Sequence, residues 1–323
     1  MRWLRKFAGG AFVVLVLLWV ANNSTLIHVA EDQAPRLIAH RGVHQVYAGK
    51  DRHNDTCTAN PIHPVTHQLI ANTIPSIEAA FDFGADVVEI DVHLTADSVF
   101  AVFHDWTLEC QTDGTGVTHE QRFEYLKSLD LGYGYTEDGV TFPLRGSAVG
   151  AIPSLSEVLG ADLAGQVLIN FKSNREEEGA HLADMLNDAT ARDKVFAVYG
   201  GNRPTQLAMQ AVDGLREFGK ADLKACLKDY ALLGWSGYVP PNCRNRVIAI
   251  PMDYAPFLWG WPHRFTQRMK NHRTEVILWG PYDGSGFSSG IDDAETLDRV
   301  PAQFDGYIWT NRIELIGPMV KSR

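Results

Sequence analysis

Short apolar runs rich in β-branched residues alternate with longer helix-like stretches along the chain from residue 35 onward. Strands separated in this way by helical patterns are typical of parallel βαβ units. About eight such strands in 323 residues favour an α/β fold, a single closed (β/α)₈ TIM barrel, over an open doubly wound sheet. The predicted strands are residues 36–40, 87–94, 99–104, 167–172, 195–199, 246–250, 275–279 and 307–310.

Several predicted helices have recognisable ends. A helix over 76–83 stops at Gly84, and another helix covers 176–186. Ser154 and Glu157 form the S-x-x-E pattern of a capping box, which predicts a further helix start. No G-x-G-x-x-G motif follows the first strand, so a dinucleotide site is not indicated.

The N-terminal segment, residues 1–34, departs from the barrel pattern. Three basic residues precede an uncharged apolar run over 7–21, which is typical of an export signal or a short membrane anchor. The run is shorter than the roughly 20 residues of a spanning helix, which favours a signal peptide. Trp19 near its end and the lack of an A-x-A site argue against cleavage. In both cases we expect the barrel, residues 35–318, to be periplasmic or extracellular, and an uncleaved segment would tether it to the inner membrane.

The charge balance separates the same two parts. The whole chain carries −10, and the first 21 residues carry three basic and no acidic side chains, which leaves −13 on the remainder. An acidic body argues against nucleic acid as a partner. An anionic substrate would need local positive charge, from a metal ion or from particular Arg and Lys side chains.

Four cysteines are present, and none forms a C-x-x-C pair, which argues against a zinc site. In an exported protein disulfides are the expected state, whereas free buried thiols would be expected in the cytosol. Four cysteines allow three connectivities, and their spacing favours Cys57–Cys110 and Cys226–Cys243.

Polar side chains stand at the ends of the first predicted strands, where barrel enzymes place their active sites. His40 and Arg41 end the first strand. Alternation along the second strand puts Glu89 and Asp91 on one face, and two inward carboxylates are costly to bury without a cation. A hard divalent ion such as Mg²⁺ or Ca²⁺ would resolve that repulsion. The alternative is a solvated pair on an edge strand, which the surrounding aliphatic residues disfavour.

Two further strand ends add to this group. His104, followed by Asp105, ends the third predicted strand, so two histidines stand beside the carboxylate pair as an acid/base constellation. Asn170 and Lys172 end the fourth, offering a neutral oxygen ligand and a fixed positive charge. A metal, two His, Arg and Lys together suit attack on phosphorus.

Taken in order and at these spacings, several segments resemble the glycerophosphodiester phosphodiesterase family. The resemblance covers roughly residues 36–316 and rests on residues 40–42, 72–80, 89–97, 102–105, 152–157 and 306–312. It implies a TIM barrel that hydrolyses glycerophosphodiesters to an alcohol and glycerol 3-phosphate. It also implies the related phospholipase route, in which a substrate hydroxyl attacks first and gives a cyclic phosphate.

The resemblance assigns roles to the strand-end residues. His40 and His104 would be the general acid/base pair, with the base undetermined. Glu89 and Asp91 would bind the divalent metal, Mg²⁺ or Ca²⁺. The phosphate would be held by Arg41 and Lys172.

Two positions depart from the family pattern. Ala71 stands where members commonly have Glu before Asn-Thr, and Asn170 stands where they commonly have Glu in a Glu-x-Lys motif. Asn170 can still coordinate through its amide oxygen, whereas Ala71 cannot coordinate at all. Divalent affinity follows the charge of the ligands, so we expect weak metal binding.

A long insertion, residues 43–70, follows the first strand and contains four histidines. A loop of this length at the catalytic end predicts a lid over the substrate, which a Cys57–Cys110 disulfide could pin. Regular metal-ligand spacing is absent among its histidines, which argues against a second metal there. Trp259-Gly260-Trp261 is interpreted as core packing, with a lipid-facing rim as the alternative.

These observations predict an exported phosphodiester hydrolase acting on glycerophosphodiesters or lysophospholipid-like substrates. A lipid-directed phospholipase or cyclising lyase on the same site is the nearest alternative. A catalytically impaired binding protein is the alternative from another class, motivated by Ala71 and Asn170.

Overall fold

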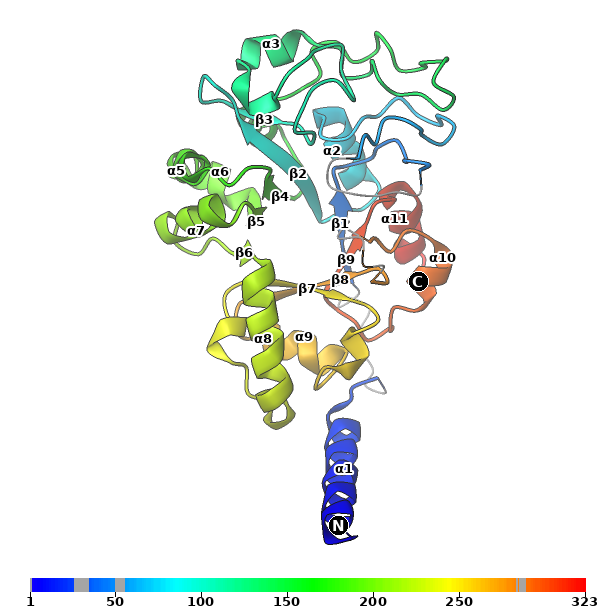
Figure 1. The fold of residues 1–323 in the computed structure, drawn as a ribbon, viewed down its shortest axis with the longest axis vertical. Helices are drawn as coiled ribbons and strands as arrows, with labels where there is room; N and C mark the ends of the chain where they lie inside the picture. The colour runs from blue at the N-terminus through cyan, green and yellow to red at the C-terminus, as the bar shows by residue number, and fades with distance from the viewer. Residues whose placement is uncertain (1, 26–34, 50–55, 283, 285–288) are drawn as a thin grey trace.

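The structure is a computed structural model that describes residues 2–25, 35–49, 56–282, 284 and 289–323 (Figure 1). Eight parallel strands form a nearly closed barrel, hydrogen-bonded in the order β6-β5-β4-β2-β1-β9-β8-β7. The predicted (β/α)₈ fold is therefore confirmed. The barrel strands are β1 (Arg36–His40), β2 (Val87–Leu94), β4 (Gln166–Phe171), β5 (Val195–Gly200), β6 (Glu217–Phe218), β7 (Val247–Pro251), β8 (Glu275–Trp279) and β9 (Tyr307–Thr310).

The two ends of the hydrogen-bonded order, β6 and β7, face each other across a seam. Arg246, just before β7, lies 3.6 Å from Glu217 of β6, measured from Nη1 to Oε1. An ion pair thus bridges the place where the two-residue β6 does not pair with β7. The barrel is closed there by side chains, not by backbone hydrogen bonds.

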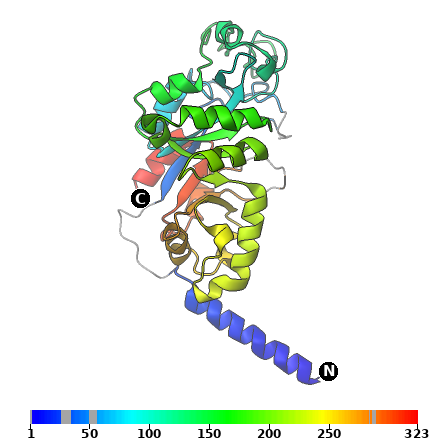
Figure 2. The same ribbon diagram turned by 90° about the vertical axis from the view of Figure 1, so that its left-hand side faces the viewer.

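Helices cover the outside of the barrel, as Figure 2 shows for its α5–α8 side. Apolar side chains fill both surfaces of the sheet: one buried cluster packs between strands and helices, and a smaller one, including Phe196 and Trp309, fills the interior. The capping box at Ser154 and Glu157 is present. The covering helices are α2 (Ile74–Asp82), α4 (Leu155–Gly160), α5 (Glu176–Met185), α6 (Ala189–Asp193), α7 (Asn202–Ala211), α8 (Lys220–Leu233), α9 (His263–Lys270), α10 (Ala294–Asp298) and α11 (Ile313–Lys321), with short 3₁₀ turns η3 (Gly234–Ser236), η4 (Pro241–Cys243) and η5 (Ala255–Phe257).

The prediction that residues 99–104 form a barrel strand is wrong. These residues contain the short β3 (Phe100–Val102), which pairs antiparallel with β2 and lies outside the barrel. The barrel strand missing from the prediction is β6, which has two residues. An apolar run does not show which direction its strand takes, and two residues show no periodicity.

A second hydrophobic core stands beside the barrel, at the top of Figure 1. It joins the later part of the insertion, through Ile62 and Ile70, to residues from 101 to 152, which include η2 (Thr118–Glu120) and α3 (Phe123–Ser128). Backbone hydrogen bonds link the two segments, and the predicted Cys57–Cys110 disulfide joins them covalently. Residues 56–70 are therefore part of a packed unit. Residues 50–55, which include His53, lie outside the described residues.

The second predicted disulfide, Cys226–Cys243, is also present and joins α8 to η4. Trp261 is buried in the main core, as predicted, and Trp259 packs partly buried against it. Phe257 beside them is exposed.

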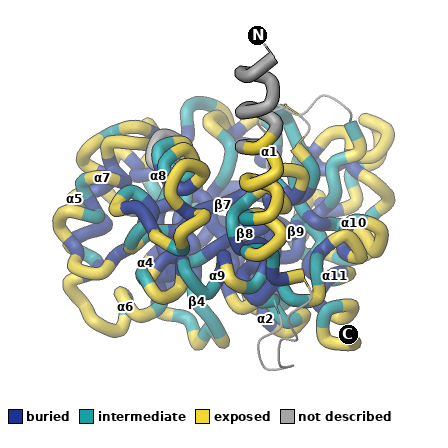
Figure 3. The backbone as a smooth tube through the Cα atoms, turned by 90° about the horizontal axis from the view of Figure 1, so that it is seen from below, coloured by how far each residue is buried: buried dark blue, intermediate teal, exposed yellow. Residues whose placement is uncertain are grey.

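The N-terminal helix α1 (Arg2–Asn22) projects from the barrel, and its described side chains, such as Val13 and Leu17, are largely exposed (Figure 3). Its end is fixed to the barrel, because Asn22 donates to the Trp235 carbonyl and Ser24 donates to the Gly260 carbonyl. Among the described residues, none of the helices meets the length and apolarity needed to cross a membrane.

Candidate active site

The barrel register explains why the predicted polar residues meet. His40 of β1 is the register partner of Glu89 of β2, and Asp91 of β2 is the partner of Asn170 of β4. The carboxyl ends of parallel strands meet at one end of a barrel, so these side chains share one site. All of them are buried or nearly so.

Arg41 leaves β1 through a tight turn that requires unusual backbone angles. Its φ is 59°, and that of Gly42 is 79°, where a side chain would also collide with the Ser76 carbonyl. Backbone bonds to Glu89 and Asn72 fix the turn. The Arg41 side chain is buried, and its Nε has no hydrogen-bond partner within the described structure. A buried unpaired guanidinium donor indicates a place for an anion.

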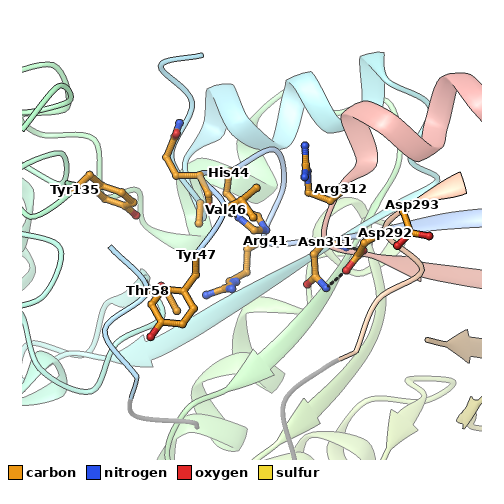
Figure 4. Close-up of a pocket in the computed structure, with 12 residues that line it drawn as sticks. Arg41, His44, Val46, Tyr47, Thr58, Tyr135, Asp292, Asp293, Asn311 and Arg312 are labelled. Atoms are coloured by element: carbon orange, nitrogen blue, oxygen red, sulfur yellow. Dashed lines mark hydrogen bonds between the residues drawn. The ribbon is translucent and has the colours of Figure 1, made fainter. Parts of the chain in front are cut away.

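His40 is held by a hydrogen-bonded chain of two further residues. Its Nδ1 lies 2.6 Å from Asn311 Oδ1. Asn311 Nδ2 in turn donates to Asp292 over 2.8 Å (Figure 4). A carboxylate only accepts, so the Asn311 amide must turn its NH₂ to Asp292 and its oxygen to His40. His40 Nδ1 is then the donor, and the lone pair of Nε2 faces Glu89, whose Oε2 is 3.7 Å away.

His104 reaches the site by a different route, from the end of the antiparallel β3 hairpin. Its Nδ1 lies 2.7 Å from Asp105 Oδ1, so a carboxylate orients this ring. Burial lowers the pKa of His104, and the nearby Asp91 charge partly opposes that shift. For His40, burial and the Arg41 charge lower the pKa well below its ordinary value. The protonated form of His104 is therefore stabilised by a hydrogen-bonded carboxylate, whereas the Nδ1 partner of His40 is a neutral amide.

The two carboxylates of β2 also differ. Burial, followed by repulsion from Asp91, raises the pKa of Glu89 to about 8. Tyr199 of β5 donates to Glu89 Oε1 over 2.6 Å, while Glu89 Oε2 is buried without a partner. Burial alone would raise the pKa of Asp91, but the Lys172 ammonium and other nearby cations hold it below its ordinary value.

Asp91 is surrounded by hydrogen-bond donors. Oδ1 accepts from Asn170 Nδ2 over 2.8 Å and lies 3.5 Å from Lys172 Nζ. Oδ2 accepts from Asn72 Nδ2 over 3.0 Å. The Asn170 oxygen packs against Gly200 instead of entering the site, since a side chain at Gly200 would collide with it. In this structure Asn170 therefore offers Asp91 a donor, whereas the prediction was that its amide oxygen would be a metal ligand.

These hydrogen-bond donors limit how many carboxylate oxygens are free to bind the metal ion that the family resemblance implies. Of the four carboxylate oxygens of Glu89 and Asp91, only Glu89 Oε2 accepts no hydrogen bond, and it lies 3.7 Å from His40 Nε2. In the described part of the chain, no group of three or more His, Cys, Asp and Glu side chains is arranged to hold a metal ion. A divalent cation needs several oxygen ligands, so the residues present do not fit tight binding of one.

A cavity of about 310 Å³ adjoins the predicted site through Arg41, Ala71 and Asn311 (Figure 4). Ala71 puts only a methyl group here. The walls come from three places: the insertion, the second core and the end of the barrel. They include His44, Tyr47, Thr58, Tyr135, Asp292 and Arg312.

Four residues of the site were not predicted as site residues. Tyr199 is the last residue of a predicted strand, so the strand-end rule that found His40 could have found it. Asn72 and Asn311 were noted only as parts of motifs. Asp292 follows β8 at a distance along the chain and carries no sequence signal.

The fold and the site define a TIM-barrel enzyme with two oriented histidines beside buried Arg and Lys side chains. The family model for glycerophosphoryl diester phosphodiesterases matches residues 40–213, more than half of the chain, and the protein belongs to that family.

Curated relatives agree with this assignment over a limited length. A glycerophosphodiester phosphodiesterase of Caldanaerobacter subterraneus is 39% identical over 66 residues, which are 20% of this chain and 27% of the relative. One from Bacillus subtilis is 34% identical over 91 residues, 27% of this chain and 30% of the relative. The matches thus span under a third of these relatives.

Solved structures show the same fold over nearly the whole chain. A glycerophosphodiester phosphodiesterase from Agrobacterium tumefaciens has a TM-score of 0.56 at 21% identity and covers 90% of this chain and 100% of its own. A glycerophosphoryl diester phosphodiesterase domain from Mycobacterium tuberculosis has a TM-score of 0.61 at 16% identity, with 88% and 99% covered. An Oleispira antarctica phosphodiesterase, solved with the product sn-glycerol-3-phosphate, has a TM-score of 0.52 at 16% identity, with 90% and 98% covered.

Proposed function

We propose that this protein hydrolyses glycerophosphodiesters to an alcohol and glycerol 3-phosphate, with His40 and His104 as the acid/base pair. The proposal rests on the difference between the hydrogen-bond partners of the two imidazole rings. His40 is oriented by a neutral amide, and His104 by a carboxylate. A neutral partner leaves Nε2 of His40 ready to accept a proton, whereas a carboxylate stabilises the cation that donates one.

In this scheme the diester phosphate binds between Arg41 and Lys172, two buried cations at the same end of the barrel. Water loses a proton to His40 Nε2 as its oxygen bonds to phosphorus. The bond from phosphorus to the alcohol oxygen breaks, and His104 donates a proton to that oxygen. One water is consumed for each diester, and the Mg²⁺ or Ca²⁺ implied by the resemblance enters none of these steps.

The test is release of glycerol 3-phosphate from glycerophosphocholine and related diesters, with and without Mg²⁺ or Ca²⁺. His40→Ala and His104→Ala should each lower kcat by on the order of 10²–10⁴. Retained activity in either variant would refute the acid/base assignment.

A lipid-directed phospholipase or cyclising lyase remains the second candidate. The cavity beside Ala71, walled partly by the insertion, favours it because it offers space next to the phosphate site for a larger substituent. Detection of a cyclic phosphate product, with lysophospholipids preferred over water-soluble diesters, would support this candidate. If neither the chain nor Ala71→Glu turned over any diester, a binding function would replace both.

We also propose that the protein is exported and remains attached to the inner membrane through α1. The exposed apolar side chains of α1 and the two disulfides support this proposal. Cell fractionation tests it: the protein should remain with the membranes after a salt wash. Recovery in the soluble periplasmic fraction would indicate cleavage.

A further inference from the structure

Three of the four oxygens of the Glu89 and Asp91 carboxylates already accept hydrogen bonds from the chain itself. Asp91 receives the amides of Asn72 and Asn170 and the charge of Lys172. Asp91 is fully buried, so water does not replace any of these partners from outside. A divalent ion at Asp91 would be repelled by the Lys172 ammonium and by the two amide NH₂ groups that point at this carboxylate.

The positive charge of the site comes from side chains. Lys172 is nearly buried, with 10% of its side chain exposed, and Nζ lies 3.5 Å from Asp91 Oδ1. Arg41 is buried with an unpartnered Nε. Lysine supplies a compact charge and arginine a directed pair of donors, and both bind phosphate oxygens.

Resting on the proposed function, we propose that this protein cleaves its diester without a divalent metal, with Lys172 in the place of the cation and Arg41 beside it. Two features explain why this chain would differ from the metal-dependent pattern that the family resemblance implies. Ala71 removes one oxygen ligand, and Asn170 turns a donor toward Asp91 where a carboxylate would turn an acceptor. The hydrolysis consumes one water, as described above, and needs no further reactant.

The experiment compares metal binding with activity. The full chain is dialysed against EDTA, its metal content is measured by elemental analysis, and it is titrated calorimetrically with Mg²⁺ and Ca²⁺. We expect no saturable binding below about 1 mM, the weak end of protein calcium sites. Addition of EDTA should leave kcat/KM unchanged, and Lys172→Ala should abolish turnover whether or not metal is present.

The variant Ala71→Glu/Asn170→Glu adds two carboxylates at the site. We expect it to bind one divalent ion and to be stabilised by that ion in a melting experiment. The matched control is Ala164→Glu/Asn187→Glu, which makes the same two changes at exposed positions and should bind none. Should the double variant fail to fold, Asn170→Glu alone replaces it.

One equivalent of tightly bound Mg²⁺ or Ca²⁺ in the unaltered chain would overturn the inference, and so would loss of activity in EDTA with recovery on adding either ion. Absence of turnover under every condition would instead refute the proposed hydrolysis. The calorimetric titration separates the two failures, because it requires no activity.

Discussion

His40 Nδ1 lies 2.6 Å from the side-chain oxygen of Asn311, at the end of β9. Asn311 is itself held at both its backbone N–H and its side-chain NH₂ by Asp292, at 2.6 and 2.8 Å. Asp292 is partly buried and also accepts from Thr310. Through this chain a carboxylate that does not contact His40 fixes which ring nitrogen carries the proton.

Asp292→Asn should therefore impair catalysis more than binding. The new amide can donate to Asn311, which frees the Asn311 side chain to turn its NH₂ toward His40 and reverse the tautomer. Loss of the correct tautomer in comparable triads costs up to about 10⁴ in kcat, and we expect a fall on the order of 10²–10⁴ with KM little changed.

The matched control is Asp293→Asn, at the exposed N-cap of α10, where Asn caps as well as Asp. ¹⁵N NMR of the His40 ring gives a second measurement, with protonation expected at Nδ1 in the unaltered chain. Equal kcat for the two variants would contradict the role of Asp292.

The pH profile of kcat/KM follows from the environment of His40. A general base works only when unprotonated, and burial and Arg41 lower the pKa of His40 well below 6.5. Activity should therefore be retained as the pH falls through 6.5 and be lost only at lower pH. An acidic limb at or above pH 6.5 would assign the base to another group.

Tyr199→Phe should reduce stability. The hydroxyl donates to Glu89 Oε1, and its removal leaves both oxygens of a buried carboxyl without a hydrogen bond. We expect a loss of about 1–3 kcal/mol in the free energy of unfolding, measured in urea. Tyr282→Phe, at an exposed tyrosine, is the control and should change it little.

The two disulfides should differ in their effect on activity. Replacing Cys57 and Cys110 by Ser opens a link across 53 residues, and the same change at Cys226 and Cys243 opens one across 17. Each loss should cost about 3–4 kcal/mol of stability. Only the first pair ties the insertion that lines the cavity, so only its removal should raise KM. A raised KM in both variants would show a general effect of destabilisation.

The barrel could be predicted from the sequence because its strands are long apolar runs between helices. The bounds of β1, β2, β8 and β9 match the predicted ranges. The direction of β3 could not be predicted, since antiparallel pairing depends on the turn before Phe100 and not on composition. The seam at β6 was missed because two residues carry no pattern.

The sequence could predict which residues lie at the site, but not which hydrogen bonds they make. Alternation placed Glu89 and Asp91 on one face, and the strand-end rule found His40, Arg41 and Lys172. The orientation of Asn170 could not be read from its position, because it depends on the acceptor that faces it in space. For the same reason Asp292 was missed: it acts on His40 only through Asn311.

The second core has a consequence for how this protein can evolve. His40, the proposed general base, and its neighbour Arg41 belong to the barrel. Thr58 and Tyr135 of the cavity wall belong to the insertion and the second core. Mutations that reshape the wall can accumulate on a unit with its own packing, without disturbing the strands that align the reacting groups. Substrate preference and chemical mechanism can thus diverge independently, so new diesters become accessible to selection while the reaction stays the same.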